Sequence, residues 1–111
     1  MTRETLPNRR SADTFEMVAR DMIFIVSFGR SPIDNRVIEV FASCSVGSSN
    51  LDVDLCDSCV AVSLALQHGA SVSDIRKSML RARNGRPAGL LGAVLDEVEL
   101  RSMVIDGEGA A

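Results

Sequence analysis

The first part of the chain alternates apolar and polar residues with the period of a β-strand. Phe15 and Met17 fall on one face and Glu16 on the other. The run 22–28 is rich in Ile, Phe and Val, and both of its faces are mostly apolar. We predict a three-stranded antiparallel meander with strands around residues 15–17, over 22–28 and over 36–43, joined by a turn at 20–21 and a connection over 29–35.

After residue 50 the apolar residues recur at helical spacing. Leu55, Cys59, Val62 and Leu66 form one stripe, and Gly69 suits the left-handed end of that helix. Ser71 followed by Asp74 is a capping signature that opens a second helix. A break at residues 84–87 precedes a third apolar stripe. The predicted helices cover 51–67, about 72–83 and about 89–102.

Strands come first and helices second, an order that predicts the α+β class. We expect a three-stranded antiparallel sheet followed by three helices that pack on one of its faces. The length of 111 residues allows a single domain. We place that domain at residues 13–103, after a basic N-terminal arm over 1–12 and before a disordered tail over 104–111.

Composition narrows the functional classes. Hydrophobic residues make up 46% and charged residues 24%, which is typical of a globular protein rather than a disordered one. The net charge of −3 argues against general electrostatic binding to nucleic acid. No run approaches the ~18 apolar residues of a membrane span, and no secretory signal opens the chain. With an odd number of cysteines, 3, we expect a cytoplasmic protein with reduced thiols and no membrane contact.

One basic stretch stands out against the acidic whole. Residues 76–86 carry five Lys or Arg residues and no acid, and the small residues that follow open the third helix. Arginine beside free helix amides is a natural site for an anion. The alternative is a solvated helix face that pairs with acidic surface. The candidate anion- or nucleotide-binding residues are Arg76, Lys77, Arg83, Arg86 and Gly89, the first three on one side of the second helix.

Cys56 and Cys59 form a Cys-x-x-Cys motif, which could be a redox pair or half of a zinc site. Of the remaining ligands, His68 lies twelve residues from Cys56, about 18 Å along a helix with a rise of 1.5 Å per residue. One ion cannot reach both residues, so we assign no metal site and interpret Cys59 as a small buried hydrophobe. A thiol pKa well below about 8.5 would instead favour thiol chemistry. The neighbouring acids, Asp52, Asp54 and Asp57, are interpreted as complementing the helix dipole.

Four segments in order resemble one known family. They are Leu-Pro-Asn-Arg-Arg at 6–10, a strand at 36–41 similar to a Gly-x-Glu-hydrophobic-Phe strand, Val-Ser-Leu-Ala-Leu-Gln-His-Gly at 62–69, and Arg-Pro-Ala-Gly-Leu-Leu-Gly at 86–92. Over roughly residues 5–100 the chain resembles the TSCPD domain. That domain is the C-terminal domain of adenosylcobalamin-dependent (class II) ribonucleotide reductases, and it also occurs alone as a small bacterial protein.

The resemblance implies kinship to ribonucleoside-diphosphate reductase without its activity. The radical chemistry of those enzymes belongs to a separate ten-stranded barrel, which needs roughly 170 residues before loops. The family pattern has Asn and an Ala-like residue at Cys56 and Cys59, so the two thiols are not a family redox pair. We therefore expect no catalytic residue and no cofactor in this chain.

Three functional readings follow. The first is a non-catalytic accessory or interaction module that contacts a nucleotide, a nucleic acid or a partner such as a reductase subunit. The second is a thiol-redox or zinc protein that uses Cys56 and Cys59. The third is a structural homo-oligomer without a ligand.

A homodimer is expected in any case. With helices on one face of the sheet, apolar residues such as Ile23, Ile25 and Phe41 would remain exposed on the other. An exposed patch of this kind usually marks an interface, and two-fold dimers are the commonest closed assembly.

Overall fold

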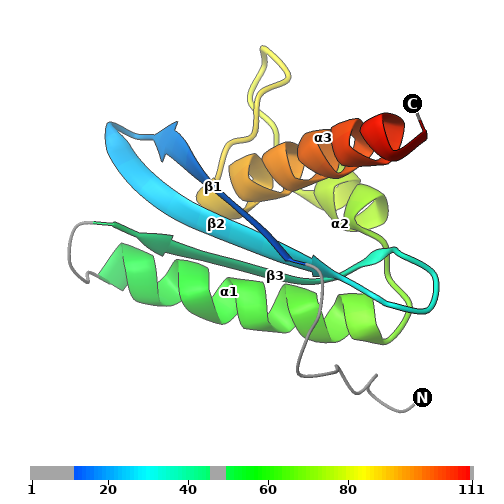
Figure 1. Cartoon of the computed structure of the whole chain (residues 1–111). Coiled ribbons are helices and arrows are strands. Elements are labelled where there is room, and N and C mark those ends of the chain that lie inside the picture. Colours follow the sequence, from blue (N-terminus) through cyan, green and yellow to red (C-terminus); the bar gives the residue numbers. More distant parts are fainter. Residues whose placement is uncertain (1–11, 46–49, 111) are drawn as a thin grey trace.

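The computed structural model describes residues 12–45 and 50–110, and their order confirms the predicted α+β class. The basic arm and the loop at 46–49 lie outside the described residues. A three-stranded antiparallel sheet is followed by three helices (Figure 1). The elements are β1 (Ala12–Ala19), β2 (Met22–Arg30), β3 (Val37–Cys44), α1 (Asn50–Gln67), α2 (Val72–Ser78) and α3 (Leu90–Ala110).

The strands follow each other in the sheet in chain order, β1-β2-β3. The predicted turn between β1 and β2 consists of Arg20 and Asp21, whose φ angles of 52° and 60° are both left-handed. Two such residues match the right-handed twist of a tight hairpin. Phe15 therefore lies opposite Val26, and Val26 opposite Ala42, so that one face collects the buried side chains of all three strands.

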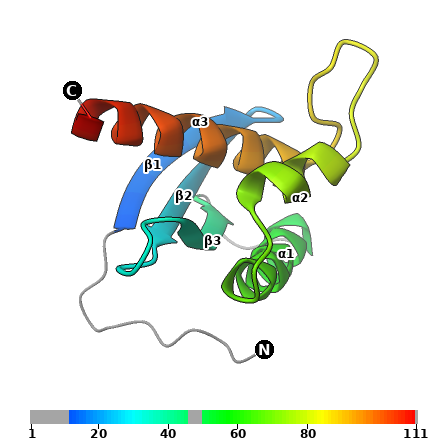
Figure 2. The same ribbon diagram turned by 90° about the vertical axis from the view of Figure 1, so that its right-hand side faces the viewer.

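The core lies between that face and the helices. Phe24, Val26 and Phe28 project from the central strand and are at most 1% exposed. Figure 2 shows α3 above the sheet and α1 beside β3, with α2 between the two helices. The helices complete the core with Leu55, Cys59, Val62, Leu66, Val94, Leu95 and Val98. In the described part of the chain, no helix is long and apolar enough to cross a membrane.

Helix α1 also covers the outer edge of β3. The Ser63 hydroxyl accepts a hydrogen bond from the Val40 N–H at 2.9 Å and donates one to the Val40 carbonyl at 3.0 Å. One turn later, the Gln67 amide donates to the Ile38 carbonyl at 3.1 Å. These side chains are buried, so the edge groups of β3 find protein partners where water is excluded.

The first half of α1 continues this cover. The Asp52 carboxylate accepts from the Cys44 N–H at 2.7 Å, and the Cys56 thiol lies 3.4 Å from the Ala42 carbonyl. Positions 52, 56, 63 and 67 share one side of a helix at spacings of 4, 7 and 4 residues. A polar stripe of α1 thus runs along the strand beside its apolar stripe.

Helix α2 is shorter than predicted. The Ser71 hydroxyl accepts from the Asp74 N–H at 3.0 Å, which confirms the predicted N-cap. The helix ends at Ser78, because Met79 turns to an extended conformation with ψ of 152°. The predicted continuation to residue 83 is wrong.

The last helix is longer than predicted. It runs to Ala110, whereas we expected a helix to residue 102 and a disordered tail. Adding residues to an existing helix costs less than starting one, so Gly107 and Gly109 do not end it.

The edge cover can be tested at Ser63. Replacing Ser63 by Ala should destabilise the protein by about 1–3 kcal/mol, because the buried N–H and C=O of Val40 lose their partner. Ser58→Ala is the matched control, since that hydroxyl donates to the Asp54 carbonyl of its own helix. It should change stability by less than about 0.5 kcal/mol. Urea unfolding of the variants measures both effects, and equal midpoints would contradict this role of Ser63.

Candidate functional site

The basic stretch folds into a hairpin rather than a helix. The Ala82 N–H donates to the Arg86 carbonyl at 2.8 Å, and the Ala88 N–H donates to the Leu80 carbonyl at 3.0 Å. Gly85 closes the tip with a φ of 84°, a conformation that favours glycine. This segment, residues 80–88, is called the basic hairpin below. It projects away from the body of the molecule (Figure 1).

Two of the arginines bind acidic residues of α3, Arg81 from the hairpin and Arg76 from α2. Arg81 holds Asp96 with two guanidinium nitrogens, at 2.7 and 2.8 Å. Arg76 reaches the same carboxylate at 2.9 Å and Glu99 at 2.8 Å. The hydrogen bond from Arg81, assisted by Arg76, keeps the pKa of Asp96 below its usual value, and Asp96 in turn raises the pKa of Arg81. Arg76 therefore has acidic partners within its own chain.

The other predicted cations are exposed. Lys77 lies on α2, while Arg83 and Arg86 lie on the basic hairpin, so Arg83 does not share a helix face with Arg76 and Lys77 as expected. Within the described residues none of the three makes an ion pair. Gly89 is exposed directly before α3.

An additional arginine approaches from the sheet. Arg20, in the turn between β1 and β2, donates to the Ala88 carbonyl at 3.3 Å. Sequence reasoning took Arg20 only as a turn residue and did not single out Asp96. Arg20 contacts a residue 68 positions away in the sequence, and Asp96 contacts Arg81, 15 positions away. Contacts at these separations leave no local sequence pattern.

Two hollows adjoin the hairpin. One, of about 350 Å³, lies between residues 16–18 of β1, Arg86 and Pro87, and one side of α3. Arg101 borders it, with its guanidinium 3.9 Å from the centre of the Phe15 ring. The other, of about 340 Å³, is lined mainly by apolar and small residues from Met79 to Gly92.

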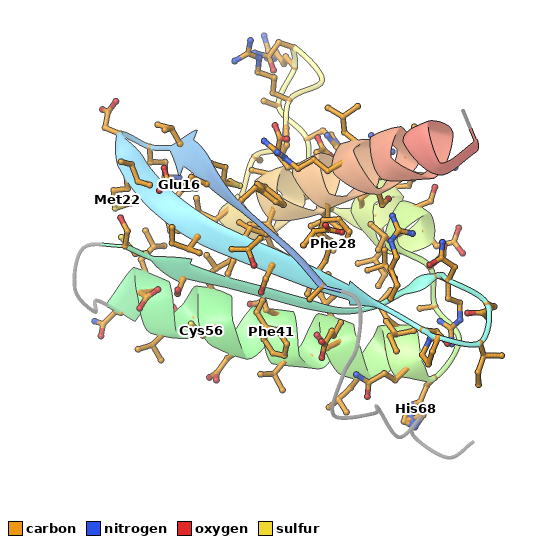
Figure 3. The ribbon with its side chains drawn as sticks, in the orientation of Figure 1. Glu16, Met22, Phe28, Phe41, Cys56 and His68 are labelled. Carbon is orange, nitrogen blue, oxygen red and sulfur yellow. The ribbon has the colours of Figure 1, made fainter. Side chains whose placement is uncertain are left out.

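The two thiols of the Cys-x-x-Cys motif face β3. Cys59 is fully buried, and burial, together with the neighbouring Cys56, raises its pKa to about 11. Burial and the nearby Asp52 and Asp57 also raise the pKa of Cys56, which is labelled on α1 in Figure 3. Both thiols are therefore protonated near neutral pH, the opposite of a reactive cysteine.

The remaining candidate ligands do not join the thiols. His68 is exposed at the end of α1, where a ring nitrogen lies 3.1 Å from the Leu64 carbonyl (Figure 3). Among the described residues, no three His, Cys, Asp or Glu side chains gather closely enough to hold a metal ion. Asp52 does more than complement the helix dipole, because its carboxylate accepts a hydrogen bond from the Cys44 N–H at the end of β3.

No protein-family model, curated protein or solved structure matches this chain.

The anchoring role of Asp96 predicts a pH-dependent stability. Because its pKa is lowered on folding, the stabilisation is complete above the unfolded carboxyl pKa of about 3.9 and disappears as pH falls further. Asp96→Asn should therefore cost about 1–3 kcal/mol at pH 7, and the variant should approach the wild type below pH 4. Chemical unfolding at several pH values measures this difference.

The matched control is Asp57→Asn, which removes an exposed carboxylate that has no arginine partner among the described residues. It should shift stability by less than about 0.5 kcal/mol at pH 7. A wild-type advantage over Asp96→Asn that persists unchanged at low pH would contradict the ion-pair explanation.

Proposed function

We propose that this chain is a stand-alone TSCPD-like domain, related to the C-terminal domain of class II ribonucleotide reductases, and that it is a non-catalytic binding module. Its basic hairpin binds the phosphate groups of a nucleotide or nucleic acid. The observation that carries the proposal is the division of the arginines. Arg81 holds the hairpin on α3 and Arg76 holds α2 on the same carboxylate, while Arg83 and Arg86 extend from the hairpin without an ion pair in the described structure.

Phosphate chemistry suits this arrangement. A guanidinium donates two parallel hydrogen bonds to phosphate oxygens and stays charged at every physiological pH. Arg20 and Lys77 add positive charge beside the hairpin. The segment 86–92, on which part of the resemblance rests, supplies Arg86 and the small residues next to it, so the proposed site and the family resemblance share residues.

A partner role fits the same module. A reductase subunit is the partner class that the resemblance suggests, and the module would act on deoxyribonucleotide metabolism in the cytoplasm. The thiol-redox or zinc alternative has less support, because both thiols of the motif have raised pKa values.

The anion site is tested by titrating nucleotides and short DNA duplexes at low salt. The double variant Arg83→Ala/Arg86→Ala should bind at least tenfold more weakly than the parent. For DNA, the slope of log K against log salt should fall by about 0.9 for each lost phosphate contact. Arg36→Ala removes one positive charge away from the hairpin, where Arg36 pairs with Asp34, and it is the charge-matched control for each of the single variants Arg83→Ala and Arg86→Ala. Equal binding by the double variant, or no binding by the parent, would refute the site.

The uncovered face of the sheet is the proposed surface for a homodimer. Val18 is 72% exposed, and Ile23 and Phe41 are each 43% exposed. Val60 of α1, 51% exposed, borders a hollow of about 240 Å³ with Ile25 and Phe41, which extends the apolar surface past the edge of β3. A second copy would remove this surface from water.

Sedimentation at micromolar concentration should show the dimer, and Phe41→Lys should convert it to a monomer, because an ammonium group would be buried in the interface. Leu80→Lys is the control, since Leu80 is 81% exposed on the basic hairpin. A parent that sediments only as a monomer excludes this assembly.

A further inference from the structure

The two edges of the sheet differ in how their backbone groups are satisfied. Side chains of α1 bind the outer edge of β3, as described above. At the other edge, Ala19 and Met22 close the two-residue turn and therefore exchange hydrogen bonds with each other. Alternation along β1 then directs the N–H and C=O groups of Thr14, Glu16 and Val18 away from β2. In the described structure these outward groups make no hydrogen bond.

A groove follows this open edge. The 350 Å³ hollow has residues 16–18 of β1 as one wall and the basic hairpin and α3 as the others. A strand added to a sheet lies about 4.8 Å from its neighbour, so the space required is that of one extended chain. A second copy of the whole protein would bring its own hairpin and α3 to the same place. The groove therefore fits a single segment better than a complete domain.

The charges in the groove indicate what that segment carries. Asp96 and Glu97 line it but already have arginine partners, at 2.7 and 3.4 Å. Arg86 also lines it and makes no ion pair among the described residues. Glu16, whose side chain lies on the uncovered face, is labelled on β1 in Figure 3. On the hairpin side of the groove, the charge without an ion-pair partner among the described residues is therefore the positive charge of Arg86.

We propose that the outer edge of β1 binds an extended acidic segment of a partner protein, which joins the sheet as a fourth strand. Backbone hydrogen bonds to Thr14, Glu16 and Val18 supply affinity, as in other complexes in which a peptide adds to a sheet edge. A carboxylate of the segment pairs with Arg86. The exposed Val18 offers an apolar contact to a β-branched residue on the same face.

The test uses peptides selected from a random dodecapeptide phage library against the whole chain. Selected peptides should alternate β-branched residues with Asp or Glu. On binding, they should slow hydrogen exchange of the Thr14, Glu16 and Val18 amides. Val18→Pro removes one outward N–H that β2 does not use, and it should weaken binding at least tenfold. Val18→Thr, the matched control, keeps the N–H and the β-branched shape and loses one methyl of the apolar contact, so it should weaken binding much less than Val18→Pro.

Circular dichroism and the thermal midpoint of Val18→Pro establish that the variant is folded, and the exchange experiment on the parent gives an independent reading if it is not. The proposal is overturned if no peptide is selected above background, if Val18→Pro binds like the parent, or if the three amides gain no protection. Self-association that persists in Phe41→Lys and disappears in Val18→Pro would also overturn it, because a second copy would then occupy the edge rather than the uncovered face. Nucleotide binding should be unchanged in Val18→Pro, so failure here is distinguishable from failure of the anion site.

Discussion

The structure depends on the side-chain hydrogen bonds by which α1 binds the edge of β3. A sheet of three strands has a large share of its backbone at edges, and unpaired edge groups invite contact with other chains. Ser63 and Gln67 occupy those groups from within the molecule and fix the position of α1 along the strand. With α1 fixed, its apolar stripe meets the same core that α3 closes from above. The opposite edge, β1, receives no such cover from the described residues.

Ion pairs fix the other half of the molecule. Asp96 on α3 is held by Arg81 at the base of the hairpin and by Arg76 on α2. These partly exposed charges tie the hairpin to α2 and α3, which already meet in the apolar core. Their net contribution is moderate, as expected for pairs still open to solvent. The arrangement keeps a projecting loop in one orientation. Because Arg83 and Arg86 make no ion pair with the described residues, that fixed orientation lets them bind an anion with little loss of entropy.

Contacts between α1 and β3 explain three residues, Cys56, Cys59 and Asp52, that the sequence alone presents as candidates for chemistry. The Cys-x-x-Cys motif resembles a redox or zinc motif, but its thiols face the edge of β3 at positions that a helix needs for packing. Asp52 belongs to an acidic run that suits a helix N-terminus, and it also caps the strand. Each of these residues is explained by its neighbours in space, and burial together with nearby negative charge raises the pKa of the Cys56 and Cys59 thiols.

The sequence by itself determined the element types and the core. Alternation in the first third and the 3.6-residue stripe in α1 predict strand and helix because burial of one face selects the period. The Ser71 cap and the Gly69 stop were also readable, since capping is local chemistry. The end of α2 and the basic hairpin were decided by the tertiary structure. Arg81 lies outside α2 and binds the carboxylate of Asp96, 15 residues further along the chain. Local helix propensity carries no information about that partner. The division of the arginines into those that bind α3 and those that make no ion pair with the described residues therefore appears only when α3 is placed beside them.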